Sequence, residues 1–332
     1  MKTIYLSLRG DPSGGGPSVF CFKMANELVK RGYKVIYDNP QKSDIALCII
    51  ESGKTFRIVD TKKTKVVVRL DGAYFKEYWH GKTSDRAWRP DMTALHNAIK
   101  RDVEKASLMI YQSQFSKNLI DAEIANRNTD FAIIHNGADT SIFKPITRLN
   151  DGFVNLFSAG KMRNGYLMES LIGTYIKLKE KQHKVRLILA GSMDNECLLV
   201  YNKYKGDSNI KHLGSFPNTK LNQAYAMGDI FLAPRMGSSS DNTISEAQSC
   251  GLPVIIPKWS GNVEMVEDGV SGIIVDSEGH WNYGEEYDAK LANSIETMMP
   301  KLNEFKKKAR EYAVKNLSVE SMVDKYLNVM GL

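Results

Sequence analysis

Residues 238–254 place one carboxylate ahead of a tight turn and an apolar strand. Glu246 is followed by the small residues 249–251 and by the apolar run 252–256, which has the pattern of a buried strand. A charged acceptor at the mouth of a strand–helix crevice forms short, strong hydrogen bonds with hydroxyl groups. The segment therefore predicts a site for a ligand rich in hydroxyls, such as a sugar, with Glu246 as the acceptor.

A glycine loop follows the first predicted strand. It contains Gly14, Gly15 and Gly16 and leads into a helix. Consecutive glycines let backbone N–H groups approach an anion closely, and the helix N-terminus adds partial positive charge. The loop is neither a P-loop nor a dinucleotide fingerprint. An anion site is predicted here, and a plain flexible turn is the alternative.

Two cations, Lys161 and Arg163, follow a strand predicted near residues 154–158. The carboxyl ends of strands are where α/β sheets bind ligands. Two cations at such an edge can neutralise a diphosphate leaving group. Solvated loop charges are the alternative interpretation.

Residues 73–90 mix aromatic rings with basic side chains. Aromatic rings stack on sugar faces and cations hold phosphates, so this segment is predicted to cover an acceptor molecule. The expected acceptor-binding residues are Tyr74, Trp79 and Trp88 of this segment, together with Arg69 shortly before it. A loop packed over the first sheet is the alternative.

Strand-like and helix-like segments alternate along the whole chain and must position these residues. Such alternation predicts parallel sheets with helices on both faces. At about 150 residues per domain, the 332 residues form two domains. We expect Rossmann-like domains at 1–148 and 149–316, and a C-terminal helix at 317–332 that packs back on the first domain.

Composition and charge narrow the class of protein. The 42% hydrophobic and 25% charged residues are ordinary for a globular protein. The apolar runs are far shorter than the roughly 20 residues of a membrane span, no signal-peptide pattern is present, and the four cysteines have no paired spacing. Residues 1–150 carry 24 Lys and Arg against 16 Asp and Glu. We expect a cytoplasmic protein whose basic first half contacts anionic partners, including the surface of an anionic membrane; no nucleic-acid-binding motif is present.

Taken in order, these segments resemble the family 4 glycosyltransferases, which are retaining enzymes of the GT-B fold. The landmarks that carry the resemblance are residues 14–16, 136–145, 160–161, 189–191, 212–214, 229–234, 246–254 and 261–272. The resemblance implies an α/β protein in which two Rossmann-like domains face each other across a cleft. Residues 69–72 and 111–116 look like a branch of the family that acts in surface-polysaccharide biosynthesis.

The resemblance implies a metal-independent hexosyltransferase without a further cofactor. It would move a sugar from a UDP- or GDP-linked donor to a glycan, a glycolipid or another hydroxyl acceptor, with retention of configuration. The expected catalytic residues are Lys161 and Arg163, which meet the diphosphate, and Asp71, which stands at the position of the family's active-site His. The expected donor-binding residues are Gly14, Gly15, Gly16, Gly160, Ser238, Ser240, Asp241, Asn242, Thr243 and Glu246.

The chain departs from the family pattern at three positions. Glu246 matches the second Glu of a family motif and would hold the donor's ribose, but Ser238 stands where the first Glu binds the transferred sugar. Asp241 is the nearby carboxylate that can take over this contact. Asp71 replaces a His, and His135 replaces a Pro. The principal alternative is therefore a sugar-nucleotide-binding protein with weak or no catalysis; an epimerase and a glucosyltransferase acting on nucleic acid are two others.

Overall fold

The chain divides into two compact units. The computed structural model describes residues 1–50, 52–72, 90–216, 220–277 and 282–332. Met1–Gly137 and Val319–Leu332 form the first unit, and Ala138–Ser318 forms the second. The division follows Gly137, whereas the boundary expected from the sequence followed residue 148.

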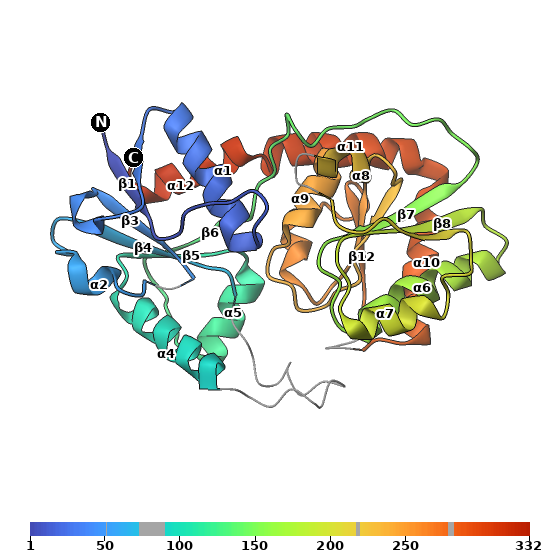
Figure 1. Ribbon diagram of the computed structural model, residues 1–332, viewed down its shortest axis with the longest axis horizontal. Helices are drawn as coiled ribbons and strands as arrows, with labels where there is room; N and C mark the ends of the chain where they lie inside the picture. Colours follow the sequence, from blue (N-terminus) through green and yellow to red (C-terminus); the bar gives the residue numbers. More distant parts are fainter. Residues whose placement is uncertain (51, 73–89, 217–219, 278–281) are drawn as a thin grey trace. The chain divides into compact units, whose positions relative to one another are not determined.

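The first unit is a parallel sheet whose described strands run in the order β2-β1-β3-β4-β5-β6. The strands are β1 (Thr3–Leu6), β2 (Lys34–Ile36), β3 (Ile45–Ile49), β4 (Lys65–Leu70), β5 (Leu108–Tyr111) and β6 (Phe131–Ile133). The helices are α1 (Gly16–Lys30), η1 (Pro40–Lys42), α2 (Thr55–Ile58), α4 (Pro90–Lys105), α5 (Gln114–Glu123) and α12 (Val319–Met330). One apolar cluster joins α1 and α12 to the sheet, and another joins α4 and α5 to its other face (Figure 1).

Helix α1 shows why these segments adopt their structure. Phe20, Met24 and Leu28 recur at helical spacing and are almost fully buried. The helix ends before Gly32, whose φ of +85° is open to glycine without strain. Helix α12 completes the same core from the far end of the chain, and the rings of Phe20 and Tyr326 lie 5.5 Å apart.

The second unit repeats this architecture with the strand order β12-β11-β10-β7-β8-β9. Its strands are β7 (Val154–Ala159), β8 (Val185–Ala190), β9 (Ile210–His212), β10 (Ile230–Leu232), β11 (Val254–Pro257) and β12 (Gly272–Val275). Its helices are α6 (Gly165–Glu180), α7 (Asn195–Asn202), α8 (Leu221–Tyr225), α9 (Asn242–Ser249), η3 (Gly261–Met265), α10 (Glu285–Met298), η4 (Met299–Lys301) and α11 (Leu302–Asn316). All described pairings are parallel, so the two parallel α/β sheets predicted from the sequence are confirmed.

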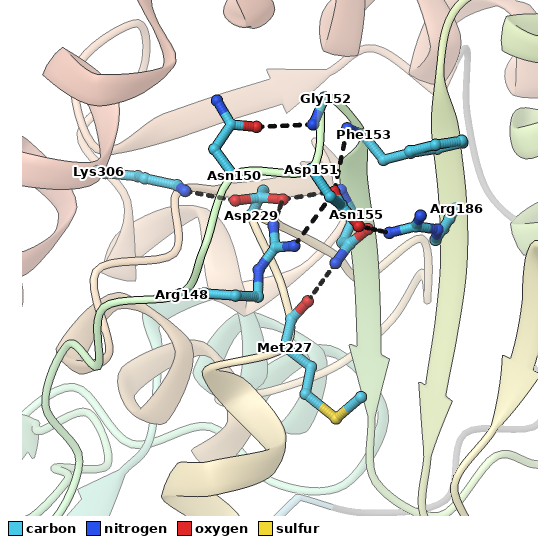
Figure 2. Close-up of polar contacts among 10 residues, drawn as sticks. All are labelled: Arg148, Asn150, Asp151, Gly152, Phe153, Asn155, Arg186, Met227, Asp229 and Lys306. Atoms are coloured by element: carbon cyan, nitrogen blue, oxygen red, sulfur yellow. Dashed lines mark hydrogen bonds and ion pairs between the residues drawn. The ribbon is translucent and has the colours of Figure 1, made fainter.

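An ion-pair cluster ties the segment before β7 to the sheet and to α11 (Figure 2). Asp229, which directly precedes β10, accepts hydrogen bonds at 2.5 Å from both Arg148 Nη2 and Lys306 Nζ. Its Oδ2 also accepts from the backbone N–H of Asn155 in β7 at 2.9 Å. The carboxylate side chain is only 10% exposed, so the three donors offset its desolvation.

Replacing Asp229 by Asn should destabilise the protein. Arg148 and Lys306 lose their shared counter-charge in a partly buried place, which should cost about 2–4 kcal/mol of unfolding free energy. Urea denaturation followed by circular dichroism measures this. The matched control is Asp151→Asn, because Asp151 pairs with Arg186 at 2.5 Å but is 44% exposed; its loss should destabilise the protein clearly less than the loss of Asp229. Equal effects of the two substitutions would contradict this account.

Helices α6 and α10 enclose a second buried carboxylate. Asp288 Oδ1 accepts a hydrogen bond from Ser170 Oγ at 2.6 Å. A Cβ atom on Gly173 would lie 2.2 Å from Asp288 Oδ2, so glycine makes room for the carboxylate. Burial raises the pKa of the Asp288 carboxyl to about 6.

Asp288 therefore gives the fold a pH dependence of known sign. The folded-state pKa lies above the unfolded value of about 4, so the stabilising proton is fully bound below about pH 4 and is lost as the pH rises through about 6. At pH 8, Asp288→Asn should unfold at a higher temperature than the wild type, because its unfolding free energy is larger by about 1–2 kcal/mol after allowance for screening. At pH 4 the two proteins should unfold at the same temperature. Thermal melts across this range test the prediction. Glu304→Gln, an exposed carboxylate of α11, is the control and should not change the pH profile.

Candidate functional site

The carboxyl ends of β7 and β8 approach each other closely. A Cβ atom on Gly191 would lie 1.9 Å from the carbonyl oxygen of Gly160, so no side chain fits at position 191. A Cβ on Gly160 would lie 3.7 Å from Thr243 Cγ2, in the first turn of α9. Gly160, the residue after β7, therefore lies beside the N-terminus of α9. A single site that contains both Gly160 and Thr243 requires this proximity.

The loop after β7 presents its two cations to solvent. Lys161 and Arg163 are exposed, while Met162 between them is 3% exposed and part of the apolar core. The backbone N–H of Met162 donates to Ser192 O at 2.8 Å. Because the buried residue alternates with the two charged ones, anchoring Met162 turns both cations outward.

The N-terminus of α6, next to these cations, is already capped by carboxylates. Asn164 N donates to Asp194 Oδ2 at 2.9 Å and Gly165 N donates to Glu196 Oε2 at 3.0 Å. These two amides are engaged within the protein, so they do not contribute to an anion site. The exposed cations of this edge are Lys161 and Arg163, and the first turn of α9 lies beside Gly160.

Arg235 is a further cation at this edge that the sequence interpretation missed. It follows β10, the neighbour of β7 in the sheet. Its Nη2 donates to the carbonyl oxygen of Lys161 at 2.9 Å. Its place shortly after a predicted strand was the available signal, but no motif marked it.

The segment before α9 is held by the residues of η3. Asp241 N donates to Asn262 Oδ1 at 2.8 Å, and Asn262 Nδ2 donates to Asp241 Oδ2 at 3.0 Å. Gly261 N donates to Ser238 O at 2.7 Å. Ser238 and Ser240 are buried, whereas Asp241, Asn242 and Thr243 are partly exposed. The segment around residue 262 thus fixes the position of the chain just before α9, where the expected donor-binding residues lie.

Glu246 lies one turn further along α9 and is 7% exposed. Its Oε2 accepts a hydrogen bond from the hydroxyl of Tyr225 at 3.0 Å. Burial, followed by the charge of Glu246, raises the pKa of Tyr225 well above its ordinary value, so the phenol stays a donor. Burial likewise raises the pKa of the neighbouring Cys250 thiol, which keeps this cysteine protonated and unreactive.

The glycine loop of the first unit is held by its own side chains. Asp11 Oδ1 accepts from Ser13 N at 2.8 Å and from Ser13 Oγ at 2.7 Å, and Asp11 N donates to Ser18 Oγ at 2.9 Å. These bonds from Ser13 lower the pKa of the Asp11 carboxyl. Residues 14–16 are exposed and lead directly into α1, which begins at Gly16.

Arg69, which is buried, pairs with the partly exposed Asp71 at the carboxyl end of β4. Arg69 is 1% exposed and its Nη1 donates to Asp71 Oδ1. The guanidinium also lies 3.8 Å from the ring centroid of Phe20 and next to the phenol of Tyr326. Burial lowers the pKa of Arg69, but the ordinary value is so high that the group stays charged. Arg69 was expected to bind an acceptor, and its side chain is instead enclosed by protein groups.

Three of the expected acceptor-binding residues, Tyr74, Trp79 and Trp88, lie outside the described residues. In the part of the chain that the structure describes, no three His, Cys, Asp or Glu residues are grouped to hold a metal ion. No helix in that part has the length and apolar character that a membrane span requires.

A family model matches most of the second unit, and curated relatives match short segments of the chain. Residues 154–296 match the family described as glycosyl transferases group 1. A GDP-mannose-dependent alpha-mannosyltransferase from Corynebacterium glutamicum is 32% identical over 63 residues, which are 19% of this chain and 15% of that protein. The matches with curated relatives span 15% of their length or less.

Solved structures resemble the chain over its whole length. Sucrose-phosphate synthase from Thermosynechococcus elongatus has a TM-score of 0.77 at 14% identity, covering 100% of this chain and 98% of that chain. HepE from Anabaena, solved in complex with UDP and glucose, has a TM-score of 0.70 at 19% identity, covering 100% of this chain and 99% of that chain. At these identities the likeness establishes the fold alone, and it confirms the GT-B fold class expected from the sequence.

Removing the Tyr225 hydroxyl should weaken the second unit. Tyr225→Phe keeps the ring but takes one donor from the buried carboxylate of Glu246, which should cost about 1–3 kcal/mol of unfolding free energy. The control is Tyr204→Phe, because Tyr204 is 37% exposed. Chemical denaturation of both variants tests this, and an unchanged midpoint for Tyr225→Phe would show that the hydrogen bond does not hold Glu246.

Proposed function

We propose that this chain, whose residues 154–296 match the family of group 1 glycosyl transferases, transfers a sugar from a nucleotide-diphosphate donor to a hydroxyl acceptor with retention of configuration. One observation carries the proposal. The exposed cations Lys161 and Arg163 leave β7 where Gly160 meets the first turn of α9, the helix that also bears Glu246. A pyrophosphate suits such an edge, because two cations and the N-terminus of a helix supply positive charge there.

The second unit supplies the donor site in this proposal. Lys161 and Arg163 stabilise the departing nucleotide diphosphate, and a preorganised donor at such a position contributes about 3–4 kcal/mol to the barrier reduction. The donor-binding set consists of Gly160, Ser238, Ser240, Asp241, Asn242, Thr243 and Glu246. Glu246 accepts from the ribose hydroxyls, with Tyr225 fixing its carboxylate. A phosphate oxygen of the leaving group takes the acceptor proton, so the step needs no metal ion.

The first unit supplies the other half of the reaction in this proposal. The glycines at 14–16 contribute N–H groups toward the phosphates and the transferred sugar, and Asp71 contacts the sugar. Tyr74, Trp79 and Trp88 bind the acceptor, while Arg69 supports Asp71 from beneath. Holding the two substrates together supplies further rate, up to about 7–11 kcal/mol in well-oriented cases.

Nucleotide and acceptor follow by analogy with the relatives. The names of the matched proteins include a UDP complex and a GDP-mannose-dependent enzyme, so we propose a UDP- or GDP-linked hexose. The acceptor is a glycan or a lipid-linked glycan of surface-polysaccharide biosynthesis. Basic groups of the first unit then provide peripheral contact with an anionic membrane.

The second candidate function is donor binding with little catalysis. It is favoured by Ser238, which is 8% exposed and lacks the carboxylate of the family motif. Asp241, the expected substitute, has Oδ2 engaged by Asn262. An enzyme releases free sugar or transfers it, whereas a binding protein retains the donor intact.

Lys161→Ala should lower turnover about 100-fold or more, because a cation at the leaving group is lost, and should leave the unfolding midpoint unchanged because Lys161 is exposed. UDP-glucose and GDP-mannose are the donors to test, with release of nucleotide and sugar followed by mass spectrometry. Lys203→Ala removes another exposed cation of the same unit and is the control. Near-normal turnover in Lys161→Ala would reject the assigned role, and a wild type that binds a donor without consuming it would favour the binding protein.

A further inference from the structure

Four polar side chains meet at the carboxyl edge of the first sheet. Arg69 and Asp71 stand at the end of β4, Gln112 directly follows β5, and Asn136 follows β6. β4, β5 and β6 are neighbours in the sheet, so their carboxyl ends lie side by side. Among the four, the proposed function uses Asp71 and its support by Arg69; Gln112 and Asn136 have no role in it.

The hydrogen bonds among these side chains form a closed ring. Gln112 Nε2 donates to Asp71 Oδ1 at 2.7 Å, and Gln112 Oε1 accepts from Asn136 Nδ2 at 2.8 Å. Asn136 Oδ1 accepts from Arg69 Nη2 at 2.8 Å, and Arg69 Nη1 returns to Asp71 Oδ1. Gln112 Nε2 also donates to the carbonyl oxygen of Leu70 at 3.0 Å. Each amide has one acceptor and one donor role in the ring, which fixes the orientation of both.

The ring treats the two oxygens of Asp71 unequally. Both of its donors converge on Oδ1. The other oxygen, Oδ2, is shielded from solvent and has no hydrogen-bond partner among the described residues. A shielded carboxylate oxygen without a donor is costly. The three supporting side chains are 1%, 4% and 6% exposed for Arg69, Gln112 and Asn136, whereas the Asp71 side chain is 20% exposed.

We propose that Gln112 is a positioning residue for the sugar-transfer reaction: together with Arg69 and Asn136 it holds Asp71 so that Oδ2 accepts a hydrogen bond from a hydroxyl group of the substrate. The inference rests on the proposed function and deepens it. Arg69 places a positive charge beside Asp71 Oδ1, and Gln112, which donates to the same oxygen, leaves Oδ2 for the ligand. A hydroxyl satisfies Oδ2, whereas an anionic group placed there would be repelled.

Two substitutions separate positioning from packing. Gln112→Met keeps the volume but removes every hydrogen bond of the side chain. Gln112→Glu keeps the acceptor for Asn136 and replaces the donor to Asp71 by a repelling oxygen. Gln114→Ala is the matched control, because Gln114 is exposed two residues away on the same segment. Turnover and KM for UDP-glucose and GDP-mannose are measured for each, together with the unfolding midpoint.

We expect both Gln112 variants to lose about 10- to 100-fold in kcat with a donor KM within about threefold of the wild type, and Gln114→Ala to match the wild type. The ring also predicts non-additivity. Asp71→Asn lowers kcat by itself, and adding Gln112→Met to it should lower kcat no further, because Gln112 acts through Asp71. The double-mutant comparison uses only variants that fold and that have similar unfolding midpoints.

Two results would overturn the inference. Normal kcat in Gln112→Glu would show that the donor to Asp71 is unimportant, and independent, multiplicative losses in the double variant would show that Gln112 does not act through Asp71. Should Gln112→Met unfold, Gln112→Glu carries the same comparison. A wild type without activity on either donor contradicts the proposed function itself, whereas an active wild type with unaffected Gln112 variants contradicts only the positioning role.

Discussion

The candidate donor site depends on a backbone contact between Gly160 and Gly191. A side chain on Gly191 would collide with the carbonyl oxygen of Gly160 at 1.9 Å. The two residues have φ values of +123° and +120°, which glycine adopts without strain. Because the carboxyl ends of β7 and β8 are in contact here, the backbone after β7 has little choice of direction as it leaves the sheet. The buried side chain of Met162 then determines which way Lys161 and Arg163 point.

The first unit meets a different constraint, a charge enclosed by protein. An unpaired guanidinium at the depth of Arg69 would cost several kcal/mol. Asp71 and Asn136 pair its two Nη groups, and the Phe20 face supplies a further favourable contact. Polar networks of this kind are stable only when nearly every member is satisfied. Two buried atoms of this network, Asp71 Oδ2 and Arg69 Nε, have no hydrogen-bond partner among the described residues, and Asp71 Oδ2 is the one of the two that can accept a hydrogen bond.

The fold was predictable from the sequence because its signals are local. Strand and helix periods alternate along the chain. The glycines and cations of interest follow predicted strands, and this position is what singled out Lys161 and Arg163. Relations between distant segments were not predictable. Asn136 bonds to Arg69 and Gln112, which are distant from it in sequence, so no local pattern marked it as part of a polar network. The capping of α6 by Asp194 and Glu196 likewise becomes visible only when the loops after β7 and β8 meet.

The first unit is built from two stretches of chain separated by the entire second unit. Its core includes Met322, Val323 and Tyr326, which are supplied only by the final helix. During synthesis on the ribosome, the second unit has all its residues before that helix emerges. The first unit therefore completes its core only after the second unit has been synthesised, and until then the apolar surface that α12 covers stays exposed.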